Sequence, residues 1–428
     1  MDGQLQPART REPLSARQVR GFWAAWCGWT LDGMDSFVFA LVLTPALTEL
    51  LPRSGLSGAP AHVVAAGSVL FAVFLAGWGS SILWGAVGDR WGRARALAAA
   101  VICYALFTGA AAAAQNVYEL GVFRFLAGVG IGGEWALAGT YVAEVWPESR
   151  RRMGAGYLQT GYYAGFFLAA ALNYTVGARF GWRAMFLCGA VPVLLALYML
   201  RRLDESERWT RATARHGEHH PLRLIFSAPY RRRTLVNSAL VTVSIIGLWA
   251  GSVYEPTAII TLARHAGRSV AQASRLASLG TGVLSLATAA GCIVAPPLAE
   301  RLGRRRALAL YFVGMALCIW LSFGWAFYAG GPGLFIATLL GLGLFGGNFA
   351  LYSLWLPEQY PTVMRATAFA FATSAGRFIG AGANFAIGAA VNAYGSVGKP
   401  VAITAVAFLM GLLLLPLALE TRGQKLPG

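Results

Sequence analysis

The sequence predicts an all-α integral membrane protein whose twelve transmembrane helices form two related, pseudo-symmetric six-helix bundles. Three observations predict it: an apolar composition, a one-sided distribution of basic residues, and an internal repeat. Hydrophobic residues make up 57% of the 428 residues and charged residues only 12%, about half of the roughly 25% typical of soluble domains. Several stretches with few charges reach the roughly 20 residues that a helix needs to cross a bilayer.

Twelve candidate spans account for the apolar stretches. They cover residues 21–51, 63–87, 96–114, 117–146, 153–178, 182–202, 232–262, 272–298, 307–328, 333–357, 366–393 and 400–419. We therefore expect an N-terminal tail over 1–20, bundles over 21–202 and 232–419, a linker over 203–231 and a tail over 420–428. Because the number of spans is even, both tails lie on one side of the membrane.

The basic residues orient the chain. The net charge is +17, and most lysines and arginines fall in the two tails and in the loops after the even-numbered spans. This distribution follows the positive-inside rule and predicts a multi-pass protein of the cell (inner) membrane with both termini cytoplasmic. Since the bilayer accounts for the charge, we expect no nucleic-acid partner.

Reactive side chains form no recognisable catalytic or metal-binding pattern. The cysteines are scattered through apolar segments, at Cys27, Cys103, Cys188, Cys292 and Cys318, without the spacing of a metal site or a disulfide framework. The histidines outside the linker, His62 and His265, have no ligand-spaced companion. We therefore expect no enzymatic activity, no metal and no cofactor, with a proton gradient as the driving force.

An internal repeat relates the two bundles. Asp89, Arg90, Gly92 and Arg93 match Glu300, Arg301, Gly303 and Arg304 when 211 is added to each number. A second match, at an offset of 214, aligns Glu144, Pro147 and Arg151 with Glu358, Pro361 and Arg365. Parallel repeats of this kind build one major transporter architecture.

The loop from Gly85 to Arg95 resembles the signature of the major facilitator superfamily, and its weaker copy lies where that fold places it. Glycines permit a sharp turn between helices, while the acid and the arginines can pair with each other and with helix ends. The resemblance implies a latch between the bundles, formed by Gly85, Asp89, Arg90, Gly92, Arg93, Glu144, Arg151, Glu300, Arg301, Gly303, Arg304, Glu358 and Arg365.

Ionisable residues within the spans are functional candidates, because each costs several kcal/mol to bury unless it is paired or solvated. Asp32 and Asp35 lie three residues apart on the first span, and Arg377 lies on the eleventh. We expect Asp35 to carry protons and Arg377 to bind a substrate carboxylate bidentately. Both lie near mid-membrane, so we expect them to face a shared cavity between the bundles. The alternative is a permanent structural Asp–Arg pair.

Further candidates accompany these two residues. Asp32 is a further candidate for proton coupling. Glu134 is either a second proton site or a partner of Arg124. We also expect Glu255 to form a pair within the membrane. Helical spacing suggests that Gln159, Tyr162 and Asn173 share a cavity-facing stripe. The proposed substrate contacts are Arg377, Gln159, Tyr162, Asn173, Asn384 and Asn348.

Three segments narrow the resemblance within the superfamily. Asp32-Gly33-Met34-Asp35 is similar to the first span of aromatic-acid and sialate proton symporters, although Met34 replaces the usual aromatic residue. The segments 132–147 and 181–186 are similar to the sialate branch. This resemblance implies proton-coupled symport of a small organic acid, such as a sialate, an aromatic acid or another monocarboxylate, by a monomer. The alternative is a sugar or polyol carrier of the same superfamily.

Overall fold

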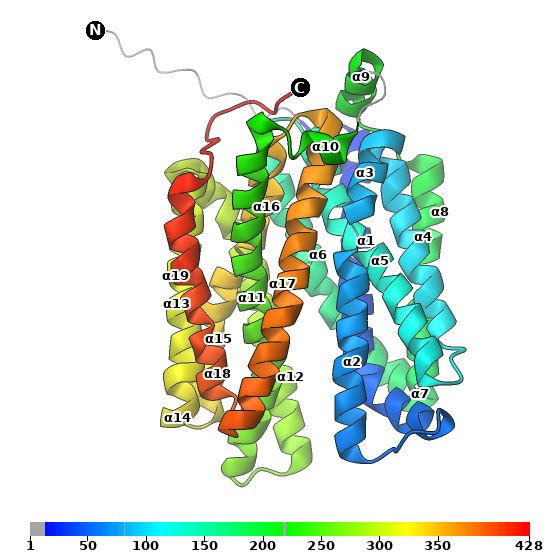
Figure 1. Cartoon of the computed structure of the whole chain (residues 1–428), viewed down its shortest axis with the longest axis vertical. Helices are drawn as coiled ribbons and strands as arrows, with labels where there is room; N and C mark the ends of the chain where they lie inside the picture. The colour runs from blue at the N-terminus through cyan, green and yellow to red at the C-terminus, as the bar shows by residue number, and fades with distance from the viewer. Residues whose placement is uncertain (1–12, 81, 217–219) are drawn as a thin grey trace.

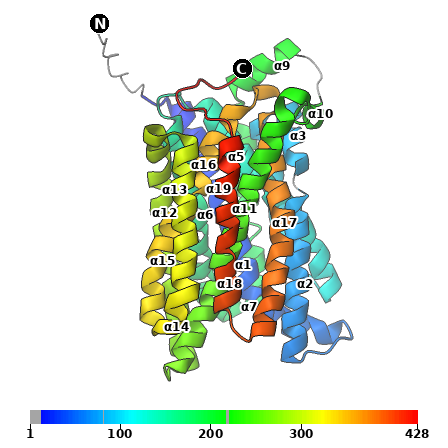
Figure 2. The same ribbon diagram turned by 60° about the vertical axis from the view of Figure 1, so that its left-hand side comes forward.

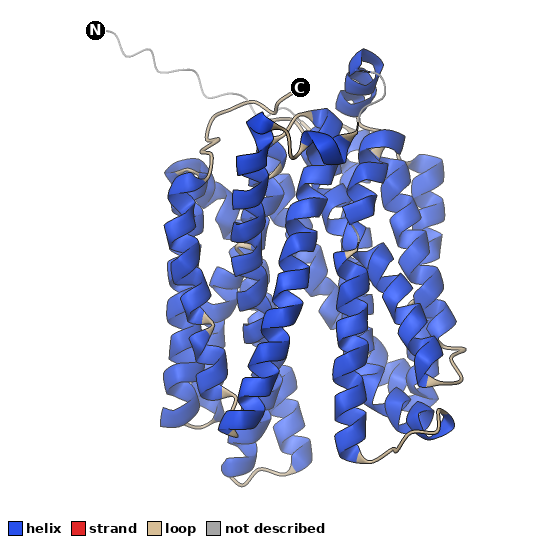
Figure 3. Ribbon diagram, in the orientation of Figure 1, coloured by secondary structure: helices blue, strands red, loops and turns tan. Residues whose placement is uncertain are grey.

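The structure is a computed structural model that describes residues 13–80, 82–216 and 220–428. Every regular element in this part of the chain is a helix, as Figure 3 shows, and no strand occurs there. The predicted all-α architecture with twelve spans is confirmed.

The first six spans comprise nine helical segments. They are α1 (Ala16–Arg53), α2 (Pro60–Gly79), α3 (Ile82–Trp91), α4 (Arg93–Ala111), α5 (Val117–Val145), α6 (Arg151–Leu172), the π-helical η1 (Asn173–Gly177), α7 (Ala178–Cys188) and α8 (Pro192–Arg202). Three pairs of consecutive segments, α2 with α3, α6 with η1, and α7 with α8, each form one span.

The linker contains α9 (Glu207–His216) and α10 (Pro221–Leu224). The last six spans comprise α11 (Ala228–His265), α12 (Val270–Leu302), α13 (Arg304–Ile319), η2 (Trp320–Ala326), α14 (Phe327–Ala329), α15 (Pro332–Gly346), α16 (Phe349–Trp355), η3 (Pro357–Gln359), η4 (Thr362–Met364), α17 (Arg365–Tyr394), α18 (Gly398–Ile403), α19 (Ala405–Leu414) and η5 (Leu415–Leu417).

The helices form two bundles that stand side by side, α1 to α8 in one and α11 to α19 in the other (Figure 1). The start of α1, the linker helices and the segment after η5 lie at the same end (Figures 1 and 2), which we call the linker end. The opposite end is called the distal end. The bundles meet where α6 packs against α12 and where α17 packs against α2 and α3.

Glycines make the two repeated loops. Gly92 separates α3 from α4 with φ +107°, and Gly303 separates α12 from α13 with φ +91°. L-residues with a Cβ rarely adopt such positive φ values, so a glycine at each of these two places allows the chain to reverse direction within one residue. The repeat predicted from sequence thus produces the same turn in both bundles.

Nine helices in the described part of the chain are long and apolar enough to span a membrane. The helices α6, α11 and α17 are not among them. Each of the three contacts the opposite bundle or lines the cavity between the bundles. Large apolar side chains are exposed elsewhere on the molecule, including Tyr174 at 84% and Leu413 at 79%. Such exposure is expected where lipid replaces water around the bundles.

Candidate functional site

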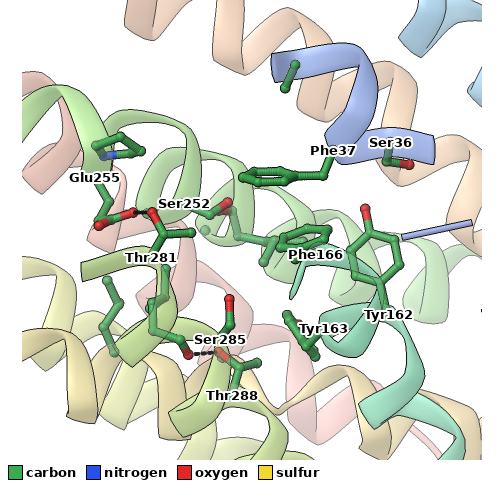
Figure 4. A pocket seen from close by; sticks show the side chains of 18 of the residues that line it. Ser36, Phe37, Tyr162, Tyr163, Phe166, Ser252, Glu255, Thr281, Ser285 and Thr288 are labelled. Carbon is green, nitrogen blue, oxygen red and sulfur yellow. Dashed lines mark hydrogen bonds between the residues drawn. The ribbon is translucent and has the colours of Figure 1, made fainter. Parts of the chain in front are cut away.

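A cavity of about 340 Å³ lies between the bundles, and its lining residues place it somewhat toward the distal end. Figure 4 shows its lining side chains from close by. The first bundle contributes α1, α2 and α6, and the second contributes α11, α12, α13 and α15. Aromatic side chains dominate the first bundle's wall, namely Phe37, Phe71, Phe74, Tyr162, Tyr163 and Phe166. An apolar cavity with a few placed polar groups is typical of small-molecule sites.

The polar groups of the cavity are mainly hydroxyls, and its one ionisable acid within the described chain is Glu255 on α11. Thr281 donates a hydrogen bond to Glu255 Oε2 (3.1 Å), as drawn in Figure 4, while Oε1 has no partner among the described residues. The expectation of a charged partner for Glu255 is therefore wrong: within the described residues it forms no ion pair. The reason is that α12 brings a hydroxyl, and no cation, against this part of α11.

Asp35 lies behind the cavity in a buried ion pair with Arg124 of α5. Arg124 Nη2 donates to Asp35 Oδ2 (3.1 Å), and Nη1 donates to Oδ1 (3.4 Å) and to the hydroxyl of Thr108 (3.0 Å). The guanidinium also lies 4.5 Å from the ring centroid of Phe39 and 4.8 Å from that of Phe74. Arg124 is thus paired within the membrane, and its partner is Asp35, not Glu134.

Arg377 extends from α17 into the first bundle. Its Nη1 donates to the carbonyl of Gly132 (3.3 Å), and its guanidinium lies 4.6 Å from the ring centroid of Trp78. It interacts electrostatically with Asp32. Arg377 is almost fully buried and is not one of the residues that line the cavity.

The predicted shared cavity for Asp35 and Arg377 is therefore not present in this conformation. Residues three positions apart on a helix point about 60° away from each other, so Asp32 and Asp35 reach different neighbours. Asp35 pairs with Arg124 of its own bundle, whereas Asp32 accepts a hydrogen bond from Ser36 and forms no ion pair with Arg124.

Ser36 connects the cavity to this charged cluster. Its hydroxyl lines the cavity and donates to Asp32 Oδ1 (3.4 Å). Asp32 Oδ2 and both carboxylate oxygens of Glu134 are buried without a partner among the described residues. Glu134 lies over Gly28 of α1, where a Cβ would overlap its carboxylate. Three carboxyl groups and two arginines are thus buried together.

Among the predicted polar contacts whose side chains the structure describes, only Tyr162 lines the cavity. Gln159 instead accepts a hydrogen bond from Ser353 of the other bundle (3.4 Å), and Asn348 donates to the carbonyl of Phe345 (3.0 Å). Asn173 lies eleven residues beyond Tyr162, about 16 Å farther along the helix axis, past the end of the cavity. Asn384 is part of α17, but its side chain lies outside the described part of the structure.

Sequence reasoning missed most of the cavity wall. The hydroxyls of Thr281, Ser285 and Thr288 all line it, and their spacing of four and three residues places them on one face of α12. That spacing could have identified them. The stack of Phe37 on Phe166, with ring centroids 4.8 Å apart, depends on the packing of α1 against α6 and has no comparable local pattern.

At the linker end, two glutamates of the repeat each bind one arginine from each bundle. Glu144 accepts hydrogen bonds from Arg93 Nε (3.2 Å) and Nη2 (3.1 Å), and from Arg365 Nη1 of the other bundle (2.7 Å). Glu358 likewise accepts from Arg304 Nε (3.0 Å) and Nη2 (2.8 Å), and from Arg151 Nη2 of the first bundle (2.8 Å). The internal repeat therefore forms a two-fold related network that joins the bundles.

The remaining repeat residues surround this network. Asp89 accepts from the backbone N–H of Ala366 (3.3 Å) and Thr367 (2.8 Å) at the start of α17, and Glu300 pairs with Arg304 (2.7 Å). Gly85 packs against the backbone of α17, so a Cβ there would overlap it. Arg90 is exposed beside His220 (3.4 Å), and Arg301 is exposed.

Comparison with known proteins agrees with this architecture. The sialic acid transporter NanX of Escherichia coli is 32% identical over 192 residues, 45% of each chain. The solved structure of the proton:xylose symporter XylE, bound to 6-bromo-6-deoxy-D-glucose, superposes with a TM-score of 0.81 and 20% identity. The superposition covers 96% of this chain and 98% of that chain, and at this identity it shows the fold alone.

The probable 4-methylmuconolactone transporter of Cupriavidus pinatubonensis is 31% identical over 420 residues, 96% of this chain and 92% of the relative. These relatives are named as transporters, and the prediction that the chain is not an enzyme is confirmed. The family model of the Major Facilitator Superfamily matches residues 25–383. This chain is therefore a multi-pass membrane transporter that belongs to the Major Facilitator Superfamily.

Proposed function

We propose that the protein is a secondary active transporter that carries a small organic acid together with protons by alternating access. The observation that carries the proposal is the buried cluster beside the cavity. Among the residues that the structure describes, it combines the acids Asp32, Asp35 and Glu134 with two arginines, Arg124 and Arg377. These residues are fully or almost fully buried. At membrane depth, an unpaired charge costs several kcal/mol of free energy.

The charges of this cluster favour proton binding. If all three carboxyl groups were ionised, two arginines would leave one negative charge without compensation. One bound proton neutralises the cluster. A substrate carboxylate that joins it adds one negative charge and therefore requires one further proton. Asp35, Asp32 and Glu134 are thus the proposed proton carriers, with Asp35 released when Arg124 changes partner.

Arg377 is the proposed partner of the substrate carboxylate. Its planar guanidinium can bind a carboxylate with two parallel hydrogen bonds, whereas here it makes one long hydrogen bond to the Gly132 carbonyl. Ser36 lines the cavity and donates a hydrogen bond to Asp32 of the same cluster. Gln159, Asn173, Asn348 and Asn384 are proposed as contacts in other conformations of the cycle, because α6 and α17 both face the opposite bundle.

The network at the linker end is the proposed latch. The bundles are joined there by four arginines and two glutamates, while the cavity lies toward the distal end. With both termini on the cytoplasmic side, as the distribution of basic residues favours, this arrangement is a conformation closed to the cytoplasm. The proposed working unit is a monomer in the inner membrane, because each chain contains both bundles.

The names of the relatives support an organic acid as the substrate of this transporter. One is a probable 4-methylmuconolactone transporter and another a sialic acid transporter. The sugar alternative draws on XylE, whose similarity here is one of fold. A neutral sugar would also leave Arg377 without an anionic ligand of its own.

The test is uptake into proteoliposomes under a proton gradient directed into the vesicles. The panel consists of sialic acid, 4-methylmuconolactone, 4-hydroxybenzoate, a short monocarboxylate and xylose. We expect accumulation of one or more acids that a protonophore abolishes. Accumulation of xylose alone, or acid uptake that is indifferent to the protonophore, would contradict the proposal.

A further inference from the structure

A second cavity, of about 560 Å³, lies at the linker end on the outside of the second bundle. It is bounded by the start of α13, by the end of α19 with η5, and by the segment that follows η5. Leu302, Leu412 and Leu415 supply apolar walls, while Arg305 and Arg306 project from α13. Figures 1 and 2 show α13 and α19 side by side at the edge of the molecule, away from the space between the bundles.

Three arginines line this cavity: Arg305, Arg306 and Arg422. Within the described residues, none of their guanidinium groups forms an ion pair or a hydrogen bond to a protein acceptor. Arginine is well suited to bind phosphate, because its fork of donors matches the phosphate oxygens. The cavity thus presents three unsatisfied phosphate-binding groups at its rim.

One carboxylate, Glu420, also lines the cavity, but its oxygens are already occupied. It accepts backbone N–H hydrogen bonds from Arg304 (3.0 Å), Arg305 (3.1 Å) and Arg422 (2.9 Å). Burial raises the pKa of Glu420, but these hydrogen bonds outweigh burial and hold the pKa below its usual value. Glu420 is therefore a fixed part of the wall, and the cavity retains an excess of positive charge.

The equivalent place in the first bundle carries more acidic residues. Glu205 lies over Gly92 and accepts the N–H of Arg95 (2.9 Å), just as Glu420 lies over Gly303. There, however, the position 215 residues before Arg422 is Glu207, which pairs with Arg17 (3.4 Å). The two bundles share the architecture of this corner and differ in the charge at this position, which is acidic in the first bundle and basic in the second.

Lipid is the ligand that this position favours. The cavity opens at the end of two spans, at the depth of the phospholipid headgroups, and basic pockets between helices at such a depth bind anionic headgroups. Beside it, toward the distal end, Leu310, Leu409 and Leu413 are exposed on α13 and α19, where acyl chains would lie. We propose that this cavity binds the phosphate headgroup of an anionic phospholipid.

The experiment is native mass spectrometry of the purified full-length protein with added phosphatidylglycerol, cardiolipin or phosphatidylcholine. We expect the wild type to retain the anionic lipids over phosphatidylcholine, and the double variant Arg305→Gln/Arg422→Gln to weaken that retention at least tenfold. The matched control is Arg95→Gln, at the corresponding corner of the first bundle, which should bind like the wild type. A lipid-free thermal melt establishes that each variant is folded.

Three outcomes overturn the proposal. One is unchanged retention by the double variant, and a second is an equal loss in Arg95→Gln, which would indicate a general effect of charge. The third is full displacement of the lipid by millimolar inorganic phosphate, which would make a soluble phosphate the ligand. None of these measurements depends on which substrate the protein transports.

Discussion

Two arginines lie buried near the middle of the molecule, and they are held in different ways. Arg124 has a bidentate carboxylate partner, a hydroxyl and two aromatic faces. Arg377 has one carbonyl acceptor and one aromatic face, with its nearest interacting acid, Asp32, forming no direct ion pair. Of the two, Arg377 therefore retains more capacity to bind a new anion.

Replacing Arg377 should abolish acid uptake. A charge-assisted hydrogen bond contributes about 1.5–3 kcal/mol, so Arg377→Ala should lower uptake by at least tenfold. Arg377→Lys should also fail, because lysine cannot bind a carboxylate bidentately. The measurement is proteoliposome uptake at equal protein insertion, with Arg183→Lys, at the distal end, as the control. Uptake at the wild-type rate by Arg377→Ala would remove this residue from the substrate site.

Replacing Asp35 should separate exchange from accumulation. In Asp35→Asn the amide holds no exchangeable carboxyl proton, so substrate accumulation against its gradient should be lost. Exchange of internal for external substrate needs no net proton movement and should continue. Counterflow and gradient-driven uptake are measured on the same vesicles, with Glu119→Gln as a surface control. Full uphill accumulation by Asp35→Asn would exclude the proposed proton role.

Glu255 should tolerate neutralisation. A carboxylate in an otherwise apolar cavity repels an organic anion, whereas the amide of Glu255→Gln keeps the shape and can still accept the Thr281 hydrogen bond. We therefore expect Glu255→Gln to transport the acid at least as well as the wild type when external pH is raised. If Glu255→Gln loses uptake at every pH, the charged carboxylate binds a donor group of the substrate.

At the scale of elements, the loops of the repeat and the ends of their neighbouring helices act together. Each glutamate of the network binds an arginine from its own bundle and one from the other. Breaking a fully buried pair costs about 3–5 kcal/mol, whereas an exposed pair contributes about 0–1 kcal/mol. The pairs that cross between the bundles are thus the ones that stabilise closure of the linker end.

Arg365→Gln should open the linker end. The substitution removes a buried inter-bundle pair with Glu144, so the conformational equilibrium should shift away from the closed linker end. The measurement is the spin-label distance between α3 and α17 at that end, which should lengthen. Arg208→Gln is the matched control, since its pair with Glu148 is partly exposed. Identical distance distributions in the two variants would show that the network does not hold the bundles together.

At the scale of the whole molecule, the bundles are joined at the linker end, while the cavity between them is displaced from the middle toward the distal end. This is the arrangement that alternating access requires, because a transporter must not open at both ends at once. The bundles contact each other through α6 with α12 and through α17 with α2 and α3. Rocking at these contacts would exchange the closed and the accessible end.

The side of the membrane that the linker end faces can be tested by cysteine labelling. With the linker end cytoplasmic, a cysteine placed at the exposed Ser57, in the distal loop after α1, should react with an impermeant maleimide in intact cells. A cysteine placed at the exposed Ala214 in α9 should react only after the cells are permeabilised. The reverse pattern would place the termini outside and invert the direction assigned to the cavity.

Much of this architecture follows from the sequence alone. Composition and the positive-inside pattern predicted twelve spans, because lipid requires long apolar helices and basic loops remain on one side. The repeat predicted that the same residues recur in both bundles, and at nearly one offset they form the same turn and the same ion pairs. Gly92 and Gly303 illustrate this, as their conformation depends on local chemistry. The latch function of the network at the linker end stays a prediction.

Only the tertiary structure decided which buried charges meet. Asp35 was expected to face a cavity shared with Arg377, yet it pairs with Arg124, while its neighbour Asp32 accepts a hydrogen bond from Ser36. Likewise, Glu255 has a hydroxyl neighbour, and Gln159 contacts Ser353 instead of the cavity. Helical periodicity fixes the face on which a side chain lies, but the neighbour it meets depends on how separate helices rotate and pack. The sequence by itself therefore determined the spans, the repeat and the charged residues, while the packing of the helices decided their partners and the walls of the cavity.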